Sequence, residues 1–230
     1  MSVGRVVRKG RIRVDARKAM AKLREHLLVD LHLYAIEVVR AAVLAGASRI
    51  DVVFDADDVE ITFDGAPLEA SRLPHLFEHL TGEAGDDPAR HLRLLALAVN
   101  AALGLSPAWV ALTASDGTSA ARVAWTPALV KAIEREEAAL PAAEGVAIPA
   151  GMPARGTRFH LRRKVGWDVV RRAAGKSAPR EIVLLTEAAH CLRVPLFVNG
   201  AALGPSSRPA VLARASFALH GVRAAHVEIT

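Results

Sequence analysis

The sequence predicts an α+β protein, a two-layer α/β sandwich in which helices pack on one face of a mostly antiparallel sheet. Helical apolar periodicity recurs in several long segments, short alternating strands come in hairpin pairs, and few crossover helices separate the strands. The chain has 230 residues, of which 52% are hydrophobic, and this is enough for one large core. We expect one main domain over residues 1–200, with residues 201–230 as an extension or the start of a following domain.

The first part of the chain predicts two helices and a strand pair. Residues 11–45 contain neither Gly nor Pro, and apolar side chains recur at helical spacing from Asp15, a suitable N-cap, to Gly46. We expect these helices to meet at a bend near residues 30–34. Residues 50–54 and 59–63 then alternate apolar and polar side chains, which predicts two short strands with a shared buried face.

Turn and cap residues predict the remaining elements. In chain order these are a short helix from Ser71 to Leu80, a buried helix from Pro88 to Leu103, hairpin strands 109–114 and 118–125 around Asp116-Gly117, a helix from Pro127 to Leu140, a loop to Gly156, a strand 157–163, a helix 179–192, and a strand 194–198 closed by a hairpin turn at Asn199-Gly200. A Gly, Pro and Ser-rich stretch at residues 204–209 has the composition of a linker.

The positive charge of the chain is segregated. Residues 1–24 hold nine Lys or Arg and only Asp15 as an acid, and residues 155–180 hold nine and only Asp168. Such clusters attract anionic partners, either a protein with an acidic surface or a nucleic acid. Because the chain has only ten aromatic residues for stacking on bases, we expect a protein partner rather than a nucleic acid.

Cysteine content and hydropathy indicate the compartment. The single Cys191 excludes a disulfide framework and a Cys-rich zinc site, which favours a reducing environment. No segment reaches the roughly 18 consecutive apolar residues of a membrane-spanning helix. We therefore expect a cytoplasmic protein without a membrane partner.

Residues 35–52 carry a resemblance to a known family. Their sequence, Ala-Ile-Glu-Val-Val-Arg-Ala-Ala-Val-Leu-Ala-Gly-Ala-Ser-Arg-Ile-Asp-Val, resembles the first motif of the GHKL (Bergerat-fold) ATPases, a helix carrying Glu-x-x-x-Asn before a small-residue turn and a strand. In element order the resemblance extends over residues 12–200 and is strongest to the HtpG-type chaperones and MutL. It implies an ATP-binding domain with chaperone-like functions.

The resemblance assigns a role to each matching position and also shows departures. Glu37 falls on the general base that activates the attacking water, but Ala41 replaces the Asn that holds magnesium. With Gly65 aligned on the second motif, Phe63 stands where the family has the Asp that binds adenine. Asp64 lies on the opposite strand face and could bind the base only if the strand bulges after Ile61. A Gly-Thr pair ending in Thr157 matches the last motif.

The family's glycine-rich phosphate lid is also altered. Between Leu80 and Arg93 only Gly82 and Gly85 remain, next to Asp86 and Asp87, whose carboxylates would repel a triphosphate. The resemblance thus implies an eroded ATPase with weak ATP binding, doubtful magnesium use and slow or absent hydrolysis. The alternative is a non-enzymatic pseudo-ATPase that binds a protein or another acidic partner through its basic segments.

One motif points to a different chemistry. His75, Glu78 and His79 match the His-x-x-Glu-His pattern of inverted zincins, in which two imidazoles on one helical face bind zinc and the Glu acts as base. A third zinc ligand has no evident source in the sequence. A zinc peptidase is therefore the third, most distant reading.

Overall fold

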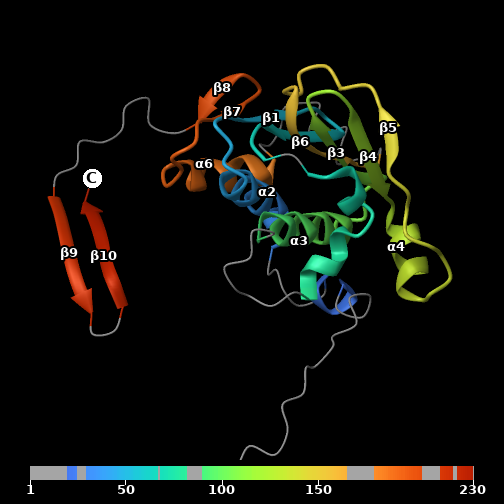
Figure 1. The fold of residues 1–230 in the computed structure, drawn as a ribbon, viewed down its shortest axis with the longest axis horizontal. Helices are drawn as coiled ribbons and strands as arrows, with labels where there is room; N and C mark the ends of the chain where they lie inside the picture. Colours follow the sequence, from blue (N-terminus) through green and yellow to red (C-terminus); the bar gives the residue numbers. More distant parts are fainter. Residues whose placement is uncertain are drawn as a thin grey trace, which may run out of the picture.

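An eight-stranded sheet forms one layer of the protein (Figure 1). The computed structural model describes residues 20–24, 30–66, 68–81, 90–164 and 179–203, together with the backbone of 213–219 and 222–229. The strand order is β5-β4-β3-β6-β2-β1-β7-β8. The strands are β1 (Ile50–Phe54), β2 (Asp58–Phe63), β3 (Trp109–Asp116), β4 (Ala120–Trp125), β5 (Glu144–Val146), β6 (Arg155–Arg162), β7 (Leu196–Val198) and β8 (Ala201–Leu203). Strands β1 and β7 pair in parallel, and the other neighbours pair antiparallel.

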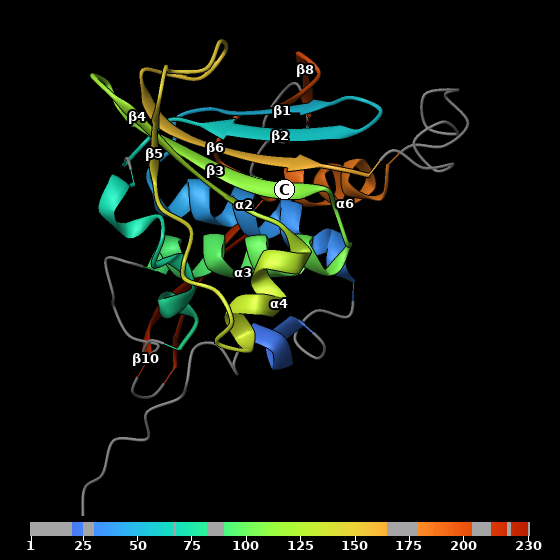
Figure 2. The ribbon, with the colours of Figure 1, turned by 90° about the vertical axis from the view of Figure 1, so that its right-hand side faces the viewer.

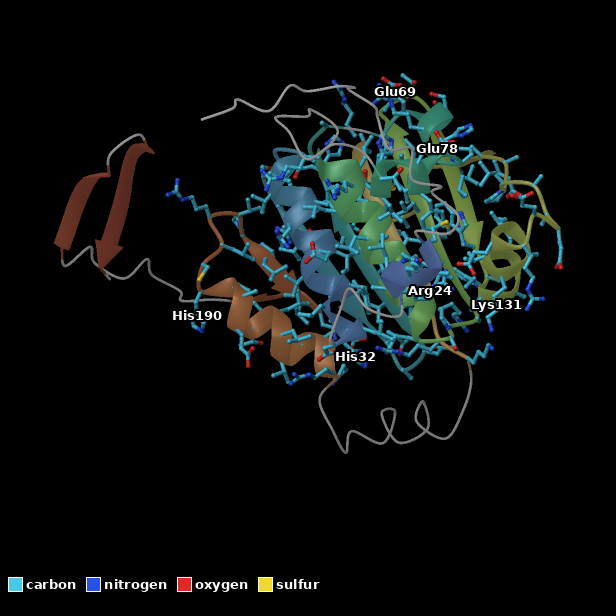
Figure 3. All side chains as sticks on the ribbon, turned by 90° about the horizontal axis from the view of Figure 1, so that it is seen from below. Arg24, His32, Glu69, Glu78, Lys131 and His190 are labelled. Carbon is cyan, nitrogen blue, oxygen red and sulfur yellow. The ribbon has the colours of Figure 1, made fainter. Side chains whose placement is uncertain are left out.

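The helices lie on one side of this sheet (Figure 2). They are η1 (Leu31–Leu33), α2 (Tyr34–Leu44), η2 (Ala70–Arg72), η3 (Leu76–Thr81), α3 (Arg90–Gly104), α4 (Pro127–Glu134) and α6 (Arg180–Ala189). Seen from below, α6, α2 and α3 lie side by side across the sheet (Figure 3). The α+β sandwich expected from the sequence is therefore confirmed.

The core lies between the sheet and the helices. The alternation in the first strand pair predicted its buried face correctly, because Ile50, Val52, Val59, Ile61 and Phe63 are each at most 2% exposed. On the helical side, α2 and α3 contribute mostly small and branched apolar residues to the same core. Burial of this apolar face is what holds each helix against the sheet.

Helix α2 ends where the sequence predicted. Gly46 adopts φ +75°, a left-handed conformation that Gly reaches without a Cβ clash. The N–H of Ala47 then donates to the carbonyl of Ala42 at 3.0 Å, which closes the helix with a Schellman-type turn. This turn directs the chain straight into β1.

Two predicted helices differ from the structure. The helix expected over Ser71–Leu80 is split into the 3-10 segments η2 and η3, because Pro74 lies between them and has no N–H to donate. Helix α4 begins at Pro127 as predicted, but it ends at Glu134 instead of Leu140. Glu136 adopts φ +62°, and this left-handed residue stops the helix.

Three strands were not predicted. Strand β5 lies in the expected loop before Gly156 and pairs with β4. It was missed because a strand of three residues is too short to show an alternation of apolar and polar side chains. Strands β9 (Ala213–Leu219) and β10 (Val222–Ile229) form a separate two-stranded sheet within the expected C-terminal extension. The residues of the expected first helix before Met20, the altered lid at 82–89 and the linker at 204–209 lie outside the described part of the chain.

Candidate functional site

Three segments of the resemblance to the GHKL ATPases meet at one end of the sheet. Gly65 follows β2 with φ +114°, and a Cβ built on it would lie 2.7 Å from the carbonyl oxygen of Ala45 at the end of α2. A Cβ on Gly156 would lie 2.3 Å from the carbonyl oxygen of Phe63. Both positions require Gly, since any side chain would overlap the neighbouring backbone. The two glycines bring α2, β2 and β6 into direct contact.

Phe63 is the residue that the sequence resemblance aligns with the adenine-binding Asp of the GHKL ATPases. Its side chain is 2% exposed and belongs to the core cluster. It lies opposite Thr157 in the register of β2 and β6. Thr157 is fully buried, and its hydroxyl has no hydrogen-bond partner among the described residues. The two residues are therefore neighbours across the β2–β6 pair.

Asp64 has a structural role in the loop after α2. Its Oδ1 accepts hydrogen bonds from the backbone N–H groups of Ser48 at 2.8 Å and Arg49 at 3.0 Å, and its Oδ2 accepts one from the Ser48 hydroxyl at 2.5 Å. Partial burial acts to raise the pKa of the Asp64 carboxyl, but these hydrogen bonds outweigh it and hold the pKa below its ordinary value. Both carboxylate oxygens are therefore engaged within the chain.

Glu37 lies near the start of α2, away from Phe63 and Asp64. With a rise of about 1.5 Å per residue, it is about 12 Å along the helix axis from Ala45. Its side chain is 8% exposed, and both carboxylate oxygens accept from the guanidinium of Arg40, at 2.7 and 3.0 Å. The structure thus places an arginine where a catalytic base would need a water molecule.

The residues at this end of the sheet do not fit a magnesium nucleotide of the GHKL type. Ala41, one turn after Glu37, is fully buried and has no oxygen to offer a metal. Phe63 fills the position of the adenine acceptor, and the carboxylate of Asp64 is bound to the loop after α2. These groups as they stand supply neither a ligand for a metal ion nor a free polar acceptor for a nucleotide base.

The His75 motif does not form a zinc site of the inverted-zincin type. His75 directly precedes the 3-10 segment η3, and Glu78 and His79 lie within it. In a 3-10 helix, residues four apart differ in direction by about a third of a turn, so the two histidines do not share one face. His75 Nδ1 lies 2.7 Å from Glu78 Oε1, so these side chains contact each other at the surface. Within the described ranges, His, Cys, Asp and Glu form no group of three or more suited to a metal ion.

A buried polar cluster, which sequence reasoning missed, lies at the opposite end of the sheet. The carboxylate of Glu181 is 1% exposed and contacts the hydroxyl of Tyr34 at 3.0 Å, the guanidinium of Arg163 at 2.6 Å and Nδ1 of His32 at 3.1 Å. Burial raises the pKa of Glu181, but the His32 contact and the charge of Arg163 outweigh it and lower the pKa to about 2. The cluster joins η1, α2, α6 and the end of β6, and Figure 3 shows His32 beside α6.

Only one sequence signal could have revealed this cluster. Glu181 lies on the apolar face of α6, next to Leu184 and Leu185 in the helical period. An acid on an apolar helical face needs a buried cation or donor. The sequence does not say that the donors come from residues 32, 34 and 163, because they lie far away along the chain.

The second basic segment, residues 155–180, is partly neutralised within the protein. Of its six described cations, four form ion pairs on or beside the sheet: Arg158 with Glu60, Arg162 with Asp57 and Asp58, Arg163 with Glu181, and Arg180 with Asp30. Charges paired in this way attract an external anion less than free ones do. The charge count of this segment therefore overstates its capacity to bind an acidic partner or nucleic acid.

Comparison with known proteins assigns no family. No family model matches the chain, and no curated protein matches its sequence. In the described part of the chain, no helix combines the length and the apolar character that crossing a bilayer requires.

Proposed function

We propose that the chain is a GHKL-type ATP-binding domain whose nucleotide pocket is eroded, so that it binds ATP weakly and hydrolyses it slowly or not at all. One observation carries the proposal: the end of α2, the Asp64-Gly65 turn and the Gly156-Thr157 pair converge at one end of an antiparallel sheet. These are three of the segments that the sequence resemblance names; residues 82–89 of the altered lid lie outside the described part of the chain. Their convergence favours an inherited pocket over a chance match of one helix.

The erosion follows from the contacts of the same residues. Phe63 has no polar group that could accept a hydrogen bond from adenine, and Ala41 has no oxygen that could bind a metal ion. The carboxylate of Glu37 accepts hydrogen bonds from Arg40. An ATPase needs all three functions at once, because the metal, the base and the bound nucleotide act in a single step. Any residual hydrolysis would depend on Glu37 and respond weakly to magnesium.

Calorimetric titration of the whole chain with ATP and ADP, with and without magnesium, tests this function. We expect dissociation constants on the order of 1 mM or weaker, and no more than a twofold effect of magnesium. If turnover is measurable, Glu37→Ala should reduce it, whereas Glu187→Gln on the exposed side of α6 should leave it unchanged. If ATP binds with a micromolar dissociation constant that depends on magnesium, the nucleotide pocket is intact. If Glu37→Ala hydrolyses ATP as fast as the parent chain, Glu37 has no catalytic role.

A second candidate function is a non-enzymatic interaction module in the cytoplasm. The observation that favours it is the engagement of the candidate catalytic groups in internal contacts, Glu37 with Arg40 and Asp64 with Ser48 and Arg49. Such a module keeps the sandwich as a scaffold for a protein partner. If millimolar nucleotide produces no binding heat and no shift in the melting temperature, the result favours this second function.

A further inference from the structure

A hollow beside the eroded pocket has the features of a ligand site. It has a volume of about 350 Å³ and lies between the loop of residues 68–71 and the β3–β4 hairpin; we call it the hairpin hollow. This size is within the usual range for small-molecule sites, about 300 to 1,000 Å³. Its lining residues are Leu68, Glu69, Ala70, Ser71, Ala114, Asp116, Ser119 and Ala121. Glu69 lies at the end of the protein opposite His32 in Figure 3.

A row of helix-facing residues in register across the sheet forms the floor of the hollow, and their side chains become smaller from β2 to β4. Across four neighbouring strands, the helix-facing positions in register are Phe63 on β2, Thr157 on β6, Ala114 on β3 and Ala121 on β4. Phe63 fills the core at one end of this row, whereas the two alanines leave space under residues 68–71. The row continues to Gly145 on β5, which has no side chain to close the hollow.

Half of the lining residues of the hollow are apolar, and its two charged lining residues are both acids. Asp116 has its Oδ1 held by the backbone N–H groups of Ser119 and Thr118, each at 2.9 Å. Among the described residues, its Oδ2 has only a long contact of 3.4 Å with the Ser119 hydroxyl, which leaves this oxygen open to a ligand. Glu69 is largely exposed and pairs with Arg72 at 3.0 Å. The hydrogen bonds from Ser119 and Thr118 hold the pKa of Asp116 below its ordinary value.

We propose that the hairpin hollow binds a small organic cation, with a flat or slender apolar body over Ala114 and Ala121 and its charged head at Asp116. Charge complementarity selects this class, because the Asp116 carboxylate would repel a phosphate or carboxylate. The fixed Asp116 carboxylate needs no rearrangement to accept an amidinium or ammonium group. The proposal does not depend on the relation to the GHKL ATPases, so a failed nucleotide titration would leave it standing.

The test uses benzamidine as the cationic probe and benzamide as an uncharged analogue of nearly the same shape. Binding to the whole chain is followed by NMR saturation transfer and by chemical-shift titration. We expect benzamidine to bind with a dissociation constant on the order of 1 mM, as suits so small a ligand, and benzamide at least about fivefold more weakly. Raising the salt concentration should weaken benzamidine binding and leave benzamide binding unchanged.

Two variants locate the site. Asp116→Asn keeps an oxygen for the backbone N–H groups of Thr118 and Ser119 but removes the charge, so it should abolish the preference for benzamidine. Ala121→Leu should fill the hollow and weaken both probes. Asp55→Asn is the matched control, because Asp55 also accepts a backbone hydrogen bond in a hairpin turn, at the other end of β2. It should leave both affinities unchanged.

The outcomes are separable. Loss of the benzamidine preference in Asp116→Asn, with Asp55→Asn unaffected, supports the proposal. Equal affinity for the two probes in the parent chain overturns it, as does benzamidine binding that survives both Asp116→Asn and Ala121→Leu. Circular dichroism of each variant shows whether it is folded, and Asp116→Asn still tests the proposal if Ala121→Leu does not fold.

Discussion

Gly65 contacts the carbonyl oxygen of Ala45 so closely that a Cβ on residue 65 would lie 2.7 Å from it. The same carbonyl accepts a hydrogen bond from the N–H of Ala66 at 2.8 Å, so it cannot move away without losing that bond. This contact fixes the end of β2 against the end of α2.

We predict that Gly65→Ala lowers the free energy of unfolding by about 2 to 4 kcal/mol, since it adds a backbone overlap to the strain of a positive φ. Urea unfolding measures this. Gly200→Ala is the control, because Gly200 also has a positive φ but nothing lies within 4 Å of its added Cβ. It should cost only about 1 kcal/mol. Equal costs for the two variants would show that the Ala45 contact is not tight.

Thr157→Val should stabilise the ligand-free protein by about 1 kcal/mol. The hydroxyl of Thr157 is buried without a partner among the described residues, and Val has the same shape without the cost of an unpaired polar group. Thermal and urea unfolding measure the change. Thr186→Val is the control, because its hydroxyl donates to the carbonyl of Ile182 at 2.8 Å, and no gain is expected there. A loss of stability in Thr157→Val would mean that its hydroxyl has a partner in solution.

Glu181 should make the protein sensitive to acid. Its pKa in the folded state is about 2, below the ordinary value of 4.5, so its contribution is fully present above about pH 4.5 and is lost as the pH falls to about 2. The shift corresponds to about 3 kcal/mol. Comparing urea unfolding of the parent and Glu181→Gln between pH 7 and pH 2 measures this contribution.

In this comparison Glu181→Gln should be less stable than the parent at pH 7, because Arg163 then lacks its buried partner. The difference between the free energies of unfolding of the parent and of Glu181→Gln should decrease as the pH falls from about 4.5 to about 2. A gap that stays constant over that range would contradict the lowered pKa of Glu181. Glu187→Gln, at an exposed position of the same helix, should follow the parent at every pH.

Arg24 attaches the described part of the N-terminal helix to α3 and α4. Its guanidinium donates to the Asn100 side chain at 3.2 Å and to Glu134 at 2.5 Å, and the Arg24 and Glu134 side chains are each 16% exposed. A double-mutant cycle of Arg24→Ala and Glu134→Ala should give a coupling energy of about 1 kcal/mol or more, above that of a typical surface pair. The exposed pair Arg72 and Glu69 provides the reference cycle, with about 0.5 kcal/mol expected. Equal couplings would show that partial burial adds nothing.

The strand parity of β2 could be read from the sequence, because alternation depends only on neighbouring residues. Val59, Ile61 and Phe63 had to share a face, and this parity is enough to assign Phe63 to the core, where it lies. The end of α2 at Gly46 was likewise predictable from one residue's backbone freedom. By contrast, β5 was missed because three residues at a sheet edge are held by pairing with β4, and the sequence does not show that pairing.

The sequence by itself determined the fold class and the buried face of the first strand pair, since each depends on residue type and local spacing. Only the tertiary structure decided how the polar groups are used. The Glu181 carboxylate meets the Tyr34 hydroxyl across 147 residues of chain, and the Asp64 carboxylate is bound to the loop after α2. Such contacts depend on packing between distant segments, because a hydrogen bond forms only where the fold brings donor and acceptor within about 3 Å.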